Sequence, residues 1–190
     1  MKSITLYQTL EDRDNPDIIE RDGPFPCRRS TAWLGDGYYF WDTHKQLAHW
    51  WGKQAYGKGK YIICVAKGIF DDSCWDLHGD GNHQLEFEQV CHEIVKKGLS
   101  SKKELLVPNV ITYMKEQGIM KYKAIRCLGM DSISYKSSDY QAFRIFFSKK
   151  GYSYLDLRPA VQICLFTKGA LSLNSYMVVF PDYYLENTFA

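Results

Sequence analysis

Apolar and polar positions follow two rhythms along this chain, one typical of strands and one typical of helices. Short runs of β-branched and aromatic residues predict strands, and apolar residues spaced three or four apart between Pro and Gly boundaries predict helices. The predicted strands cover residues 4–7, 38–41, 61–67, 123–128, 143–147, 161–166 and 176–180, with shorter extended pieces at 69–70 and 75–77. The predicted helices cover residues 17–20, 43–51, 84–97 and 108–118.

The order of these elements predicts the α+β class, because strands occupy both ends of the chain while the helices gather near its middle. A length of 190 residues fits one domain better than two. Neither internal repeats nor a linker interrupts the chain, so we expect a single domain over residues 1–190. We expect the last two strands to pair with each other through the short link of residues 167–175.

Composition and charge restrict the possible functions. The net charge of +2 is too small to predict nucleic-acid binding, although it does not exclude it, and we expect the pair Arg28 and Arg29 to be solvated surface. The six cysteines show no C-x-x-C spacing, so no zinc site is predicted. The scattered thiols and the lack of a signal peptide or an apolar stretch of about 20 residues predict a cytoplasmic protein that does not bind a membrane.

The segment G-D-G-Y-Y-F around Tyr39 is the strongest candidate for chemistry. Gly35 and Gly37 allow a tight turn and a close approach of the backbone to a ligand. The ring of Tyr39 can then stack on a planar heterocycle. The same residues also fit a glycine turn before an aromatic core strand, so the segment by itself leaves both interpretations open.

This segment resembles the signature of the ADP-ribosyltransferase family, in the branch that contains the poly(ADP-ribose) polymerases. That branch has G-x-G-x-Y-F-x-D, followed by a helix that carries a second aromatic of the pocket. The residues at those positions here are Gly35, Gly37, Tyr39, Phe40, Asp42, Ala48 and Trp50. Residues 6–9, 62–77 and 161–178 are similar to further segments of the family in the same order. The resemblance implies split antiparallel β-sheets with flanking helices.

The resemblance also implies NAD as a substrate. The family's His, Tyr and Glu positions are occupied by Gln8, Tyr39 and Gln162, so the usual catalytic glutamate is missing. Tyr39 would stack on nicotinamide with Trp50 on the other face, and the backbone of Thr9 would pair with the nicotinamide amide. Gln8 and Gln162 would bind ribose hydroxyls. Gln162 keeps its hydrogen-bonding capacity but supplies neither charge nor a base, and the loss of one such electrostatic contact often costs ~10²–10³ in rate.

Three functional interpretations follow. The first is a NAD-dependent mono-ADP-ribosyltransferase or NAD glycohydrolase, toxin-like or defensive, with an unknown acceptor. The second is a catalytically silent module of the same fold that binds a nucleotide, ADP-ribose or a protein partner, and that has an aromatic slot without a carboxylate in reach. The third is an unrelated α+β domain whose aromatic residues only form core.

Two other groups of residues are weaker candidates. Glu86 is the alternative acid, because Gln84, Glu86 and Glu88 contain both the Q-x-E and the E-x-E spacing, and arginine-modifying members of the wider family use such a pair on a strand. However, the pattern places them at the start of a helix, where acidic residues favour the helix dipole. His78 and His83 flank the sequence G-D-G-N, which fits a polar loop better than a metal site because no third ligand has suitable spacing.

Overall fold

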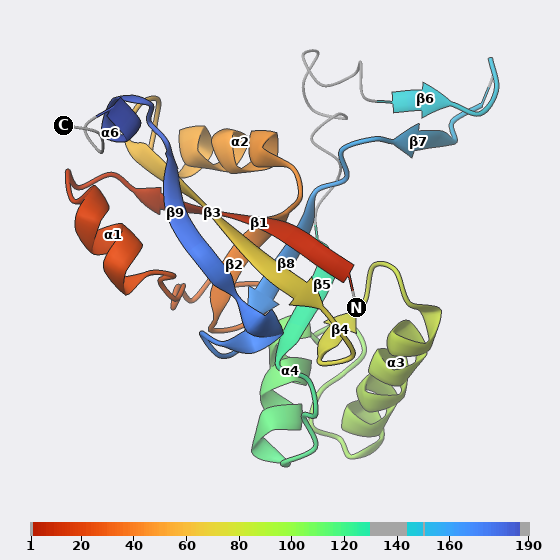
Figure 1. The fold of residues 1–190 in the computed structure, drawn as a ribbon. Helices are drawn as coiled ribbons and strands as arrows, with labels where there is room; N and C mark the ends of the chain where they lie inside the picture. Colours follow the sequence, from red (N-terminus) through yellow and green to blue (C-terminus); the bar gives the residue numbers. More distant parts are fainter. Residues whose placement is uncertain (1, 130–143, 150, 187–190) are drawn as a thin grey trace.

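Strand β1 (Lys2–Glu11) lies between β2 (Tyr38–Asp42) and β3 (Tyr61–Phe70) within a seven-stranded sheet. The computed structural model describes residues 2–129, 144–149 and 151–186 (Figure 1). The strand order is β4-β5-β8-β2-β1-β3-β9, in which the other strands are β4 (Cys74–Asp76), β5 (Ala124–Leu128), β8 (Val161–Leu165) and β9 (Asn174–Phe180). The sheet is mixed, because β4 and β5 are parallel while the neighbours of β1 and β8 are antiparallel.

The helices surround this sheet, so the predicted α+β class is confirmed. Helix α2 (Lys45–Ala55) packs against β1, β2 and β3, while α1 (Pro16–Asp22) packs against β9. Helices α3 (Gly81–Lys96) and α4 (Val107–Glu116) lie together beside β4 and β5 (Figure 1). The described part of the chain also contains the 3-10 turn η2 (Ala170–Ser172) and the short α6 (Tyr183–Glu186).

Local sequence explains where the longer helices begin. Pro16 and Pro108 lie in the first turns of α1 and α4, where a missing backbone N–H costs nothing. Helix α3 begins after Asp80, whose side chain accepts hydrogen bonds from the backbone N–H groups of Asn82 and His83. The predicted start at residue 84 was therefore three residues late.

Apolar side chains cover both faces of the sheet, because the strands alternate their residues between the two faces. On one face Leu6, Phe40 and Ile163 belong to one buried cluster. On the other face Trp75 and Cys164 belong to a cluster that also contains the apolar residues of α3 and α4. The sheet is thus the centre of the hydrophobic core and fixes the relative positions of residues that are distant in sequence.

Further details differ from the sequence-based expectations. The predicted pairing of the last two strands is wrong, because β8 lies between β5 and β2 while β9 lies at the edge of the sheet beside β3. The hairpin of β6 (Arg144–Phe146) and β7 (Tyr154–Asp156), which stands away from the sheet in Figure 1, contains a strand that the pattern did not predict. Residue 143, which the pattern placed in a strand, lies outside the described residues.

Gly52 also differs from its expected role. It was expected to end the second helix, but it lies buried inside α2. A Cβ atom at this position would overlap the ring of Tyr61 on β3, so glycine is required by close packing between helix and sheet. None of the helices in the described part of the chain combines the length and the apolar character that a bilayer span needs.

Candidate functional site

A cavity of about 600 Å³ opens beside the ends of β1, β2 and β8. Its volume lies within the range of small-molecule sites, roughly 300–1,000 Å³. Six aromatic residues line it, together with polar residues from three parts of the chain. The lining residues are Gln8, Thr9, Leu10, Phe25, Pro26, Cys27, Arg28, Arg29, Thr31, Ala32, Trp33, Tyr39, Trp41, Trp51, Tyr56, Gly129 and Gln162.

The pairing of three adjacent strands brings the central lining residues together. Tyr7 of β1 pairs with Trp41 of β2, and Trp41 pairs in turn with Gln162 of β8. Residues paired across antiparallel strands point to the same face, and so do residues two apart in one strand. One face of the sheet therefore carries Thr9, Tyr39, Trp41 and Gln162, although Thr9 and Gln162 are 153 positions apart in the sequence.

Tyr39 is held in place by its hydroxyl group. This oxygen donates a hydrogen bond to the carbonyl of Gly35 at 2.7 Å and accepts one from the backbone N–H of Leu34 at 2.9 Å. Burial is the main cause that raises the pKa of Tyr39, so the phenol stays protonated at neutral pH. The glycine turn predicted from the sequence thus fixes the aromatic ring that follows it.

Gln162 provides an unpaired acceptor at the cavity wall. Its side chain is 8% exposed, and its Oε1 has no hydrogen-bond partner among the residues that the structure describes. A buried amide oxygen without a donor costs free energy, on the order of 1–3 kcal/mol. Because this oxygen is itself buried, a ligand N–H or O–H group would reach it only after the amide turns toward the cavity.

Gln8 lines the cavity, but its amide is bonded within the protein. Nε2 donates to the carbonyl of Phe25 at 2.8 Å, and Oε1 accepts from the backbone N–H of Phe25 at 3.1 Å and from the Tyr176 hydroxyl at 2.7 Å. A ribose hydroxyl would have to replace one of these bonds. In this structure Gln8 holds the Phe25 segment against the sheet, and its predicted contact with a ribose stays a prediction.

Trp51, rather than the predicted Trp50, lines the cavity. Trp50 is half-buried and packs edge-on against Trp41, with ring centroids 6.3 Å apart. Successive residues of a helix point about 100° apart, so a shift of one position moves the ring from the packed side to the cavity side. The other predicted contact, Thr9, lines the cavity and donates its hydroxyl to the carbonyl of Ala48 at 3.0 Å.

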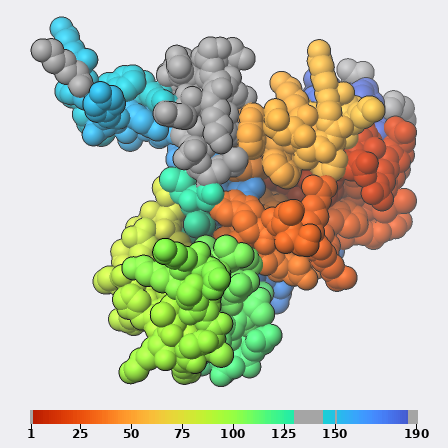
Figure 2. Space-filling view, turned by 180° about the vertical axis from the view of Figure 1, so that it is seen from behind, coloured from red at the N-terminus to blue at the C-terminus, as the bar shows by residue number. Residues whose placement is uncertain are grey.

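One wall of the cavity is a single loop, from Phe25 to Trp33, which the sequence analysis did not identify. Cys27 and Gly37 exchange two backbone hydrogen bonds, of 2.7 and 3.3 Å, that tie this loop to the start of β2. Gly129 lies directly against the ring of Trp33, where a side chain would overlap it. In Figure 2 the orange surface of this region borders the lighter orange surface of residues near 50–60, which include Trp51 and Tyr56.

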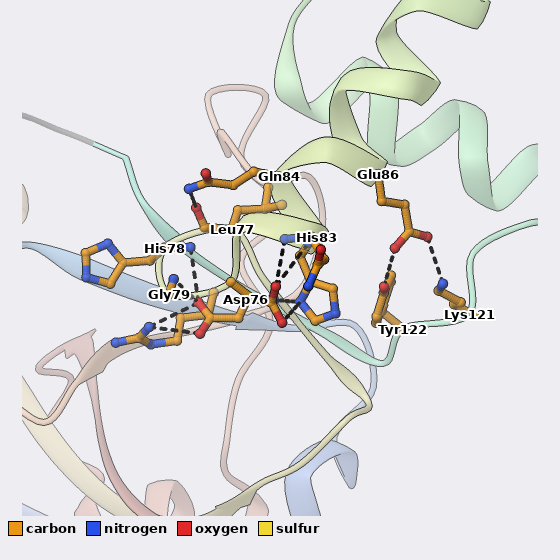
Figure 3. Close-up of polar contacts among 12 residues, drawn as sticks. Asp76, Leu77, His78, Gly79, His83, Gln84, Glu86, Lys121 and Tyr122 are labelled. Carbon is orange, nitrogen blue, oxygen red and sulfur yellow. Dashed lines mark hydrogen bonds and ion pairs between the residues drawn. The ribbon is translucent and has the colours of Figure 1, made fainter.

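A separate cluster of charged groups surrounds Arg126 of β5 outside the cavity. Its guanidinium lies 2.8 Å from Asp42 Oδ2 and 3.0 Å from Asp76 Oδ1. Asp76 also accepts the backbone N–H groups of His78 and Gly79 (Figure 3). Burial alone would lower the pKa of Arg126, but its hydrogen bond to Asp42 and the charges of both carboxylates raise it. This network joins β2, β4 and β5 through hydrogen bonds and ion pairs within the protein, so it is a structural element.

The alternative acid and the histidine loop are also bonded internally. Glu86 lies on α3, as the sequence predicted, where it accepts from the Tyr122 hydroxyl and pairs with Lys121 at 2.9 Å (Figure 3). Glu86 is not a lining residue of the cavity. His83 accepts the backbone N–H of Asp76 through Nδ1 at 2.9 Å. Within the described ranges no cluster of three His, Cys, Asp or Glu residues has the geometry of a metal site.

The lining residues define what the cavity can do chemically. They include aromatic rings, two arginines and amide groups, and none of those in the described part of the chain is Asp or Glu. Aromatic walls bind flat rings, and arginines bind anions, but neither group removes a proton at neutral pH. The arrangement therefore suits binding of a planar, anionic molecule better than acid–base chemistry.

Comparison of the chain with protein-family models, with curated proteins and with solved structures gives no significant match.

Proposed function

We propose that this chain is a nucleotide-binding module, with an ADP-ribosyltransferase-like arrangement of its pocket, that takes NAD, ADP-ribose or a related nucleotide. The observation that carries the proposal is the meeting of Thr9, Tyr39 and Gln162 on one cavity wall. The resemblance selected these three positions independently of any geometry. Core packing by itself gives no reason for them to border one open cavity.

The chemistry of the cavity supports the same ligand class. The exposed Trp51 and the half-buried Tyr39 offer aromatic surface to a planar base, with the buried Trp41 behind them. A turn of the Gln162 amide would offer its unpaired Oε1 to an amide N–H or a ribose hydroxyl. A ligand with a flat ring and a neighbouring hydrogen-bond donor would use both features at once.

Calorimetric titration of the native chain with NAD and with ADP-ribose tests this proposal. Trp51 lies at the cavity and is only partly packed, so Trp51→Ala should weaken binding about fivefold or more while the fold is kept. Tyr152→Ala removes a ring that is 98% exposed in the β6–β7 hairpin and is the matched control. No heat of binding from either ligand at millimolar concentration would refute the proposal.

Cleavage of NAD is the second candidate function, because Gln8, Tyr39 and Gln162, which occupy the three positions that the family uses, all line the same cavity. In that reaction the bond between nicotinamide and ribose C1′ breaks, its electron pair leaves with nicotinamide, and water or an acceptor adds to C1′ and loses a proton. Gln162 neither takes that proton nor supplies negative charge. Weak activity is therefore expected from this candidate.

Nicotinamide release distinguishes the two candidates. Release by the native chain that disappears in Tyr39→Ala would establish an ADP-ribosyltransferase or NAD glycohydrolase. Release by Gln162→Glu alone would identify a binding frame that lacks its catalytic carboxylate. Binding without release in both proteins would establish the silent module.

A further inference from the structure

Two arginines stand at the mouth of the aromatic cavity. Arg28 and Arg29 are both exposed and both belong to the lining residues. Arg29 reaches across to the end of α2, where its Nη2 lies 3.5 Å from the Tyr56 hydroxyl and its guanidinium lies 5.7 Å from the centroid of the Tyr56 ring. Both side chains are exposed, as the sequence predicted, and the fold places them beside the candidate ligand site.

The backbone that carries the two arginines is fixed at several points. On one side, Cys27 is bonded to Gly37 through two backbone hydrogen bonds. On the other side, the N–H of Ala32 donates to the carbonyl of Arg29 at 2.9 Å, and the N–H of Gly35 donates to the carbonyl of Ala32 at 3.0 Å. Both arginines are therefore attached to a turn whose backbone is fixed by hydrogen bonds. This lowers the entropic cost of ordering their side chains around a ligand.

The mouth carries the positive charges of both arginines. No Asp or Glu is found among the lining residues in the described ranges. Glu11, which acts electrostatically on Tyr56, is itself paired with Arg13 at 2.7 Å. Arginine binds phosphate oxygens through two parallel N–H groups, and two adjacent arginines suit a diphosphate better than a single charge.

We infer that Arg28 and Arg29 form a diphosphate subsite, so that the cavity selects a nucleoside diphosphate ester whose planar end lies on the aromatic wall. This inference rests on the proposed function, since it names the part of the nucleotide that is held at the mouth. The cavity then has two chemically distinct ends. Gln162 and the aromatic rings face the flat group, and the arginines face the phosphates.

The test compares ligands that contain one end or both. ADP-ribose should bind the native chain at least about tenfold more tightly than nicotinamide, adenosine or inorganic pyrophosphate, because each of the last three occupies one end only. Arg28→Glu combined with Arg29→Glu should weaken ADP-ribose binding at least about tenfold, and should change adenosine or nicotinamide binding less than about twofold. Lys149→Glu, which changes the charge of an exposed residue outside the cavity, should leave all affinities unchanged.

Three results would overturn the inference. Pyrophosphate that binds as tightly as ADP-ribose would identify an anion site without a nucleotide subsite. ADP-ribose affinity that survives the double charge reversal within twofold, while Trp51→Ala still weakens it, would leave the proposed function standing and remove the arginine subsite. Failure of the native chain to bind ADP-ribose at all would overturn both. The single variant Arg28→Glu repeats the test with less disturbance of the fold, because the structure describes no contact of the Arg28 side chain that would be lost. A weakened affinity in this variant is then not explained by misfolding.

Discussion

The side-chain amide of Gln8 forms a two-way hydrogen bond with the backbone of Phe25. Nε2 donates to the Phe25 carbonyl at 2.8 Å, and the Phe25 N–H donates to Oε1 at 3.1 Å. The side-chain amide thus pairs with the backbone of Phe25 as a neighbouring strand would, and it attaches the loop of residues 25–33 to β1. The Tyr176 hydroxyl donates to the same Oε1, so one buried side chain joins the loop, β1 and β9.

Replacement of Gln8 by leucine should therefore destabilise the protein. Leucine keeps much of the buried volume but leaves the backbone groups of Phe25 and the Tyr176 hydroxyl without partners. We expect the free energy of unfolding to fall by about 2–3 kcal/mol, measured by urea denaturation. Gln46→Leu, at an exposed position of α2, is the matched control and should change stability little. Equal stability of Gln8→Leu and the native chain would mean that the hydrogen bonds of Gln8 to Phe25 and Tyr176 do not stabilise the fold.

Arg126 should be essential for stability although it lies outside the cavity. Its removal in Arg126→Met leaves Asp42 and Asp76 facing each other without a positive charge in a largely buried setting. Breaking a buried ion pair from one side costs about 3–5 kcal/mol. Arg126→Lys keeps the charge but not the planar group that reaches both carboxylates, so thermal unfolding should give an intermediate stability. A methionine variant as stable as the native chain would contradict this role.

Gly52→Ala should destabilise α2 even though alanine is the better helix former. The added Cβ would overlap the Tyr61 ring, so either the helix or the ring must move. Gly81→Ala is the matched comparison, because a Cβ at that helical glycine would meet no atom within 4 Å. We expect a lower melting temperature for Gly52→Ala and an equal or higher one for Gly81→Ala. The reverse order would show that α2 does not approach β3 this closely.

His49 should make stability depend on pH. Burial, followed by the charges of Lys45 and Lys53, lowers the pKa of His49 in the folded protein. The unfolded chain then binds the proton more readily than the folded protein. The stability that neutral His49 contributes is therefore fully present above the unfolded pKa of about 6.5, and it is lost as the pH falls below that value. Thermal melting at about pH 8 and pH 5.5 should show a smaller decrease in His49→Gln than in the native chain.

The control for this measurement is His92→Gln, which changes an exposed histidine of α3. It should leave the difference between the two melting temperatures unchanged. A decrease in His49→Gln as large as that of the native chain would show that the ring is protonated equally well in both states. The hydrogen bond of 3.0 Å between His49 Nδ1 and the Tyr61 hydroxyl should be lost with the same substitution.

Thiol alkylation offers a footprint of the cavity. Burial raises the pKa of Cys64, Cys74 and Cys164 to about 12, so these thiols should resist alkylation at about pH 8. Cys27 is partly exposed and lines the cavity, so it should react, and bound ADP-ribose should slow that reaction. Cys91 on α3 is partly exposed outside the cavity and serves as the internal control in the same peptide map. Equal protection of Cys91 and Cys27 by ADP-ribose would contradict a ligand site at the cavity.

Most elements of the fold were predictable because their signals are local. The run at residues 61–67 reads as a buried strand, and β3 (Tyr61–Phe70) is one. Pro108 predicted the start of a helix, and α4 begins beside it. The hairpin strand β7 was missed, because three residues with exposed and half-buried side chains give too short a pattern.

The candidate site was predictable only in part. The glycine turn and the ring of Tyr39 are adjacent in sequence, and the turn does hold that ring. The choice between Trp50 and Trp51 depends on the rotation of α2 about its axis, which is set by packing of Leu47 and Ala48 against the sheet. The rotation of α2 about its axis cannot be predicted from the spacing of residues in the sequence alone.

The sequence by itself determined the kind of structure that each segment forms, because propensity, periodicity, and Pro and Gly boundaries act over a few residues. Only the tertiary structure decided that β2 lies between β1 and β8, which brings Thr9, Tyr39 and Gln162 to one cavity, and that Arg28 and Arg29 stand at its mouth. It also decided that Gln8 bonds to Phe25 and that Glu86 lies elsewhere. These relationships depend on strand order and register, which are selected by burial over the whole sheet, and local patterns carry no information about which distant strands become neighbours.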